Sequence, residues 1–290
     1  MMDESHLDLP PSDHDTNIYT LGRIGQHNIV IACLPAGFVG IASAASVAMM
    51  LKTTFPAIRF GLMVGLGGGV PSKEADIRLG DIVVSQPIKR HGGVVQYDFG
   101  KSTPDGFELT GFLNAPPIIL LSAITKIRGN YDLGKSSLLA EMSRLSKFPK
   151  FARDQAGSDT LFETEYRHIG GEDCTSCAST RIVQREERTS DMPVVHYGTI
   201  ASANRVMRDG IERDKISRSP GLGSVLCFEM EAAGLINNFP CLVICGICNY
   251  ADSHKNKGWQ PYAAGNAAAY ARELLLVIPG TNVEIDGEDS

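Results

Sequence analysis

Long apolar segments with the character of β-strands alternate with helix-like segments along this chain. Three of them end in small or polar residues: IRFGLMVGLGGG (58–69), VVHYGTIASAN (194–204) and CLVICGICNYAD (241–252). Apolar strands that alternate with helices indicate a mixed or parallel sheet covered on both faces. Such sheets bind ligands beyond the carboxyl ends of their strands. We therefore predict an α/β fold in which these three strand ends share one site.

The length of 290 residues suits one large α/β domain or two smaller ones. Residues 1–18 are acidic and contain proline, and we expect them to be a disordered segment. Strand and helix patterns then run from residue 19 to residue 278. A polar stretch at about 149–192 interrupts them and is interpreted as an insertion or long surface loop. An acidic tail is expected at 279–290.

The charge and cysteine patterns argue against several classes of protein. A net charge of −6 without any Lys/Arg run argues against nucleic-acid binding. Residues 29–51 are uncharged over a span that could cross a bilayer. Pro35 and Gly37 divide that span, so a buried strand–turn–helix is favoured over a membrane segment. The N-terminus lacks the features of a signal peptide, and seven cysteines, an odd number, favour a reducing, cytoplasmic location.

The segment CTSC in the polar stretch is a CxxC motif, formed by Cys174 and Cys177, and His168 is the nearest histidine. A structural zinc site normally needs four ligands, and no second CxxC accompanies this one within the polar stretch. Two thiols without a metal are therefore the favoured interpretation, with a zinc site as the lesser alternative. We expect neither a metal nor a cofactor.

Two further features could belong to a binding site. The glycine cluster of Gly65 and 67–69 would let backbone N–H groups approach a ligand, although it matches neither the Walker pattern nor a dinucleotide fingerprint. Glu231 opens a helix-like segment and could accept hydrogen bonds from a ribose diol. The alternative is that Glu229 and Glu231 only complement the helix N-terminus. From spacing alone that alternative is slightly favoured.

Taken in order, the motifs VGLGGG, LGDIVVS, HYGTIAS, FEMEAAG and CNYAD resemble the nucleoside phosphorylase/nucleosidase superfamily, nearest to its 5′-methylthioadenosine/S-adenosylhomocysteine nucleosidase branch. GLMVGLGGGVPS, QYDFGK, CFEMEAAGL and YADSHKNK are similar to the phosphorylase-type domain of fungal NOD-like receptor proteins. The resemblance covers roughly residues 19–278. It implies a single α/β domain around a twisted, partly closed mixed sheet flanked by helices, and cleavage of a purine N-glycosidic bond.

The resemblance also implies roles for individual residues. Met230 and Glu231 match the family's MetGlu pair, whose glutamate holds the ribose hydroxyls. Gly67 and Gly68 match the glycine loop near the sugar and any phosphate. Asn249 falls where the family has an aspartate that protonates purine N7 or hydrogen-bonds to it. The segment that lines the purine matches Ser202, Ala203, Asn204 and Val206.

Three departures from the family pattern bear on activity. Asn249 can donate an N–H but cannot give up a proton, and losing a general acid costs about 10²–10⁴-fold in rate. The family's first strand, which carries the glutamate that activates water, is not matched, because MMDESHLDLPP resembles the helix and loop that come after that strand. Cys245 stands where related domains usually have arginine.

Hydrolysis is favoured over phosphorolysis. Bacterial-type phosphorylases hold phosphate with an arginine and a serine at the positions of Met63 and Leu66, and neither of these side chains can bind an oxyanion. Some related nucleosidases act on ATP, and four basic residues near the glycine loop could contact a triphosphate: Lys73, Arg78, Arg90 and Lys101. Each of them taken singly is better explained as a solvated surface residue.

The resemblance leaves three functions open. The first is an N-ribosyl hydrolase for an adenine nucleoside or nucleotide within a defence protein. The second is a catalytically silent module that binds purine nucleotides or mediates oligomerisation, and the third is a phosphorylase. The expected partner is a small purine compound, with no nucleic acid and no membrane. A homo-oligomer is also expected, because an unpaired sheet edge would favour association.

Overall fold

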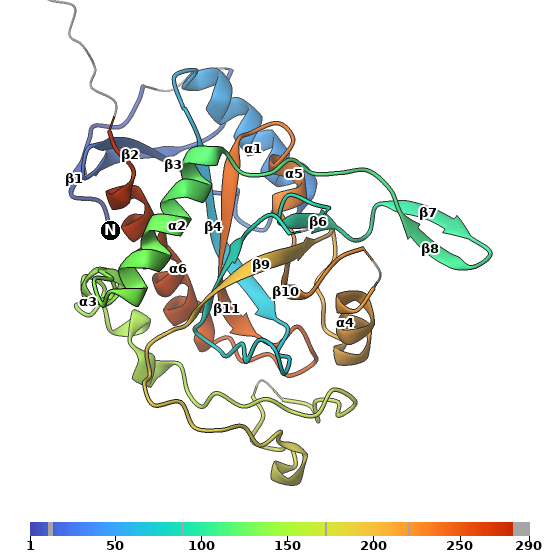
Figure 1. Cartoon of the computed structure of the whole chain (residues 1–290). Coiled ribbons are helices and arrows are strands. Elements are labelled where there is room, and N and C mark those ends of the chain that lie inside the picture. Colours follow the sequence, from blue (N-terminus) through green and yellow to red (C-terminus); the bar gives the residue numbers. More distant parts are fainter. Residues whose placement is uncertain (11–13, 89, 172, 220, 281–290) are drawn as a thin grey trace, which may run out of the picture.

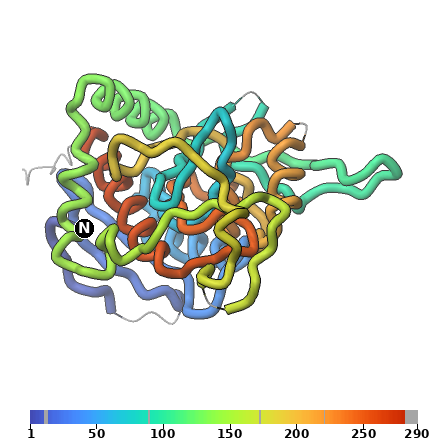
Figure 2. The backbone as a smooth tube through the Cα atoms, turned by 90° about the horizontal axis from the view of Figure 1, so that it is seen from below, coloured from blue at the N-terminus to red at the C-terminus, as the bar shows by residue number. Residues whose placement is uncertain are grey.

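The computed structural model describes residues 1–10, 14–88, 90–171, 173–219 and 221–280. Most of the predicted acidic tail therefore lies outside the described residues. Figure 1 shows a central sheet covered by helices, and a hairpin that extends away from the body. The same hairpin projects in the perpendicular view of Figure 2.

The central sheet has six strands in the order β10-β4-β11-β5-β9-β6. Their bounds are β4 Gly61–Gly69, β5 Ile82–Ser85, β6 Val94–Gln96, β9 Val195–Ser202, β10 Val225–Glu229 and β11 Cys241–Asn249. Strand β11 is parallel to β4 and antiparallel to β5, so the sheet is mixed. Strand β9 pairs with β5 along its first half and with β10 along its second half, which closes the sheet on itself. The predicted fold class, a partly closed mixed sheet flanked by helices, is confirmed.

The strand ends meet for a different reason from the one we predicted. Strand β10 is antiparallel to β4 and parallel to β9, so β9 and β10 do not end at the same edge as β4 and β11. Ser202 pairs with Glu229 at the end of β9, and the adjacent Phe228 pairs with Gly68 inside β4. Closure of the sheet, rather than a shared carboxyl edge, brings these segments together.

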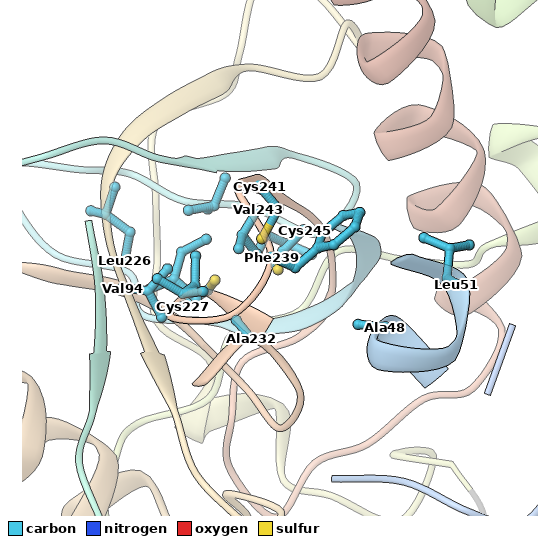
Figure 3. Packing of buried hydrophobic residues seen from close by; sticks show 14 of the residues in the cluster. Ala48, Leu51, Val94, Leu226, Cys227, Ala232, Phe239, Cys241, Val243 and Cys245 are labelled. Carbon is cyan, nitrogen blue, oxygen red and sulfur yellow. The ribbon is translucent and has the colours of Figure 1, made fainter. Parts of the chain in front are cut away.

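Two helical layers cover the sheet. On one side α1 (Ile41–Thr54) and α5 (Ala232–Leu235) pack against β10 and β11, and Figure 3 shows Ala48 and Leu51 of α1 beside Cys245 and Phe239. On the other side lie α2 (Ile118–Asp132), α3 (Leu138–Ser143) and α6 (Trp259–Val277), and buried side chains of α2, α3 and α6 join those of β5 and β11 in a second core. Because both faces of β11 are covered, its first eight residues are all buried, as an uninterrupted apolar sequence predicts.

A separate antiparallel sheet forms near the N-terminus from β1 (Glu4–Ser5), β2 (Tyr19–Ile24) and β3 (His27–Ala32). Our prediction of disorder throughout 1–18 is therefore wrong for its first residues. Strand β1 pairs with β2, and Asp3 forms an ion pair of 2.7 Å with Arg272 of α6. The Arg272 side chain is buried, and a buried cation requires a charged partner. That requirement holds the N-terminus in place.

The remaining segments are peripheral. The projecting hairpin consists of β7 (Gly100–Thr103) and β8 (Gly106–Leu109), and α4 (Gly210–Ser217) follows β9. The polar stretch predicted at 149–192 contains the 3₁₀ helices η1 (Pro149–Phe151), η2 (Arg153–Gln155) and η3 (Ser179–Arg181). The uncharged span 29–51 divides into β3, a turn and α1, and none of the helices described here has the length and apolarity that crossing a membrane requires.

Candidate active site

Gly68 is the point where the strands of the predicted site approach one another. It is aligned with Phe228 of β10 on one side and with Asn249 of β11 on the other. A Cβ atom at Gly68 would lie 2.8 Å from both Asn249 Oδ1 and Ala251 Cβ. Gly67 is nearly as crowded, with two cysteine side chains at 3.2 Å from its Cβ position. Glycine at these two positions therefore allows β4 to lie directly against its neighbours.

Asn249 is half-buried, and both the oxygen and the nitrogen of its side-chain amide form hydrogen bonds. Its Oδ1 accepts a hydrogen bond of 2.9 Å from the Ala251 N–H, and its Nδ2 donates to Cys248 Sγ at 3.2 Å. Ala251 has φ +53°, the left-handed conformation that non-glycine residues rarely adopt. Such backbone strain persists where the surrounding structure enforces it and is frequent at functional sites. The strand end therefore holds Asn249 in one orientation.

Glu231 is half-buried and reaches the N-terminus of helix α1. Its Oε1 accepts a hydrogen bond from the Gly40 N–H at 3.1 Å, and its Oε2 accepts from the Met230 N–H at 3.2 Å. Gly40 is the N-cap of α1 and has φ +93°, which favours glycine. A carboxylate at a helix N-terminus is stabilised by the helix dipole. Each Glu231 oxygen keeps a further lone pair that can accept a hydroxyl.

Glu229 is a carboxylate with a different function from Glu231. Its Oε2 accepts hydrogen bonds from the N–H groups of Glu231 (2.8 Å) and Ala232 (2.9 Å), so it complements the start of α5. Its Oε1 is buried without a hydrogen-bond partner among the described residues. Burial raises the pKa of the Glu229 carboxyl to about 7. Near-neutral carboxyl groups are enriched at active sites, and our sequence analysis did not include Glu229 in the site.

The residues predicted to line the purine differ in burial. Ser202 is buried, and its Oγ accepts the Ala233 N–H at 3.0 Å. Ala203 is buried as well. Asn204 Oδ1 accepts the N–H of Ile41, the first residue of α1, at 2.9 Å. Val206 is exposed at the surface. Asn204 therefore converges with Glu231 on the same helix N-terminus.

The N-terminus of α1 is the part of this region that our sequence reasoning missed. Gly40 and Glu231 are 191 positions apart in the chain, and Ile41 and Asn204 are 163 apart. The available signal was a glycine immediately before an Ala/Ser-rich helix, which is compatible with a ligand-binding helix start but does not specify one.

The four basic residues proposed for a triphosphate have different surroundings. Lys73 and Arg90 are exposed. Arg78 forms an ion pair of 2.6 Å with Asp76, and Lys101 pairs with Glu108 at 3.1 Å in the projecting hairpin. Arg78 also lines a separate cavity with Asp81 and Arg188, beside the polar stretch. Two of the four charges are thus already neutralised by carboxylates.

A second group of reactive side chains lies in the polar stretch. His168, Cys174 and Cys177 come together there, and their potential ligand atoms lie within 4.8 Å of one another. The other five cysteines are also free thiols.

Known proteins are similar to this chain in sequence. The sequence profile of the phosphorylase superfamily matches residues 5–276. A nucleotide-binding leucine-rich repeat (NLR)-like protein of Hyaloscypha variabilis is 47% identical over 283 residues. That match takes in 96% of this chain but 28% of the relative, so the chain spans less than a third of the relative's length.

Solved structures of other proteins share the fold of this chain. The 5′-methylthioadenosine/S-adenosylhomocysteine nucleosidase of Neisseria meningitidis, in complex with methylthio-immucillin-A, superposes with a TM-score of 0.57 at 15% identity, covering 95% of this chain and 91% of its own. Futalosine hydrolase of Helicobacter pylori gives 0.54 at 15% identity, covering 94% and 89%. At this level of identity the two structures establish a shared fold.

Proposed function

Because the chain belongs to the phosphorylase superfamily, we propose that it binds an adenine nucleoside or nucleotide and cleaves its N-glycosidic bond by hydrolysis. The observation that carries this proposal is the Glu231 carboxylate. It is half-buried, is oriented by the N–H groups of Gly40 and Met230, and follows the strand paired with Gly68. Both of its oxygens can accept one more hydrogen bond, as the two hydroxyls of a ribose would require.

Glu231 would also favour cleavage of the glycosidic bond itself. As the glycosidic bond breaks, the sugar develops the positive charge of an oxocarbenium ion. An ionised carboxylate fixed on the diol side favours that charge in a partly dehydrated site. The group therefore both binds the sugar and stabilises the transition state in this proposal.

Asn249 limits the rate in the same proposal. A purine leaves readily only if a proton reaches N7, and an amide cannot supply one. The Asn249 Nδ2 donates one of its two hydrogens to Cys248 Sγ, which leaves the other to donate a hydrogen bond to a purine. We expect a turnover about 10²–10⁴-fold below that of a variant with an acid at this position.

One observation supports hydrolysis over phosphorolysis. Met63 and Leu66, at the positions where bacterial-type phosphorylases hold phosphate, cannot bind an oxyanion. The basic residues bear on the substrate instead: Arg78 and Lys101 are ion-paired with carboxylates, so these two give little support to a triphosphate.

A second function, a purine-nucleotide-binding or oligomerisation module without catalysis, is favoured by Asn249 and by the NLR-like relative. This chain corresponds to 28% of that relative's length. A binding module of a larger receptor would retain the Glu231 arrangement and lose the acid. The homo-oligomer implied by the family resemblance stays a prediction in either case.

One assay separates these functions. Wild-type protein and Asn249→Asp are incubated with adenosine, methylthioadenosine and ATP, with and without phosphate, and adenine release is followed by chromatography. We expect Asn249→Asp to release adenine at least about 10²-fold faster than wild type, without a phosphate requirement. Asn28→Asp, the same change at an exposed position in β3, serves as the control.

Binding is measured in parallel by calorimetry. Glu231→Gln should weaken nucleoside binding about 10- to 100-fold, because hydrogen bonds to a charged acceptor are lost. Tight, Glu231-dependent binding without turnover in any variant would identify the silent module instead. Adenine release that requires phosphate would contradict hydrolysis, and binding unaffected by Glu231→Gln would contradict the site itself.

A further inference from the structure

The side chains of His168, Cys174 and Cys177 form a cluster that the proposed reaction does not use. All three are half-buried. His168 Nδ1 lies 3.8 Å from Cys174 Sγ and 3.4 Å from Cys177 Sγ. One imidazole nitrogen and two thiol sulfurs thus face a common point.

These separations match those of ligands around a tetrahedral zinc ion. With Zn–S bonds of about 2.3 Å and Zn–N bonds of about 2.0–2.1 Å, tetrahedral angles place a sulfur and a nitrogen about 3.6 Å apart and two sulfurs about 3.8 Å apart. The two sulfur–nitrogen distances of the cluster lie within about 0.2 Å of that value. The geometry therefore requires little rearrangement to admit a metal ion.

Backbone hydrogen bonds orient the His168 ring and the two cysteines toward a common point. His168 Nε2 lies 3.3 Å from the Gly171 carbonyl oxygen, which suits a tautomer with the proton on Nε2 and an unprotonated Nδ1 directed at the sulfurs. Metal-binding histidines typically donate their second N–H to a carbonyl or carboxylate in this manner. The Cys177 N–H donates to the Cys174 carbonyl at 3.0 Å, so a tight turn places both thiols on one side.

We propose that His168, Cys174 and Cys177 bind a structural zinc ion. Two thiolates and an imidazole favour zinc over the oxygen-preferring cations calcium and magnesium. The sequence alone favours two thiols without a metal, because a structural zinc site normally needs four ligands and no second CxxC accompanies this one in the polar stretch. The distances between His168 and the two thiols in the folded chain reverse that preference.

Three protein ligands leave one tetrahedral position. His254 does not fill it: its ring meets that of His168 edge-on with 5.6 Å between centroids, but its nitrogens are not among the ligand atoms that lie within 4.8 Å of one another, and its Nδ1 lies 3.6 Å from Asp252 Oδ2. A water molecule would be the fourth ligand.

The zinc would hold the polar stretch in a fixed conformation beside the loop that follows Asn249. The His168 N–H already donates to Ser253 Oγ at 3.0 Å, and Ser253 lies four residues after Asn249. The stretch is otherwise built from short 3₁₀ turns. A metal at this position would keep it packed beside the proposed site.

Metal content tests the proposal directly. The full chain is purified under reducing conditions without chelators, and zinc is measured by plasma mass spectrometry. We expect about one zinc per chain in wild type. The paired change Cys174→Ser with Cys177→Ser should abolish it, whereas Cys33→Ser, at an exposed free cysteine, should retain it. Wild type without zinc, or equal loss in the Cys33→Ser control, would overturn the proposal.

Cobalt binding provides a second measurement that does not depend on how the variants fold. Wild-type protein is stripped with a chelator and titrated with Co²⁺, and absorption is recorded. Thiolate-to-cobalt charge-transfer bands with the strong visible bands of a tetrahedral ion are expected, and added zinc should remove them. Spectra without charge transfer in the stripped, reduced protein would overturn the site.

Discussion

Glu229 and Glu231 lie two positions apart, but their surroundings give them different properties. Glu231 is half-buried and uses both oxygens on N–H groups at the N-terminus of α1 and at Met230. Glu229 is buried, uses one oxygen on the start of α5, and leaves the other without a partner among the described residues. Burial accordingly raises the pKa of Glu229 to about 7.

The raised pKa of Glu229 predicts how stability depends on pH. In the folded protein this carboxyl binds its proton up to about pH 7, whereas in the unfolded chain its ordinary value is 4.5. The raised pKa therefore contributes to the stability of the folded protein. This contribution is fully present below about pH 4.5 and is lost as the pH rises through about 7. The difference between the two pKa values corresponds to about 3 kcal/mol in the free energy of unfolding.

Urea unfolding of wild type and Glu229→Gln at pH 5 and pH 8 measures this effect. As the pH is raised from 5 to 8, we expect the free energy of unfolding of wild type to fall relative to that of Glu229→Gln, because only wild type loses the contribution of the protonated carboxyl. An unchanged difference at the two pH values would show that Glu229 does not titrate as inferred.

Strand β4 is the element on which the site depends, because it lies between β10 and β11 and approaches both closely. Its last three residues are buried glycines. Gly68 is paired with β10 and β11 at once, and its Cβ position is occupied by atoms of Asn249 and Ala251. Gly65, in the same strand, has only Met63 Cε near its Cβ position, at 3.9 Å.

The contrast between Gly68 and Gly65 makes a matched pair of substitutions. Gly68→Ala should destabilise the fold by about 1–3 kcal/mol, because the added methyl group must displace the end of β11. It should also weaken nucleoside binding. Gly65→Ala should change stability by no more than about 0.5 kcal/mol. Denaturant unfolding and calorimetry measure both effects, and equal behaviour of the two variants would contradict the close approach described for Gly68.

Over the whole molecule, helix α6 connects segments that are distant in the sequence. Arg272 Nε donates to Glu141 Oε2 at 2.6 Å, and its Nη2 donates to Asp3 Oδ1 at 2.7 Å. One buried guanidinium thus joins the N-terminal strand, α3 and α6. Arg144 gives Glu141 a second ion pair at 2.9 Å, so the network does not depend on a single contact.

Arg272→Ala should destabilise the protein by about 1.5–3 kcal/mol, because Glu141 and Asp3 lose hydrogen bonds from a buried cation while Arg144 still pairs with Glu141. The N-terminal residues should also become accessible to proteases. The control is Arg23→Ala, which removes a half-exposed pair with Glu4 and should cost about 0–1 kcal/mol. Urea unfolding and limited proteolysis provide the measurements. A small effect of Arg272→Ala, similar to that of the control, would show that the network contributes little.

Local sequence was sufficient for much of the fold. The uninterrupted apolar residues of β11 predicted a strand buried on both faces. Family motifs distributed over the chain predicted the superfamily, which is confirmed. The ordered N-terminus was missed because its stability comes from Arg272, about 270 residues away.

The amino-acid sequence by itself determined the strands, the helices, the family and the types of side chain at each strand end, since these depend on periodicity and on motifs within a few residues. Only the tertiary structure decided how those side chains are used. It directs Glu231 rather than Glu229 to the N-terminus of α1, and it brings His168 to the two cysteines. For Glu231 the physical reason is that its partner Gly40 lies 191 positions away and meets it only in the folded chain. For His168 the reason is local: the two cysteines are six and nine residues away, and the path of the polar stretch decides whether the ring faces them.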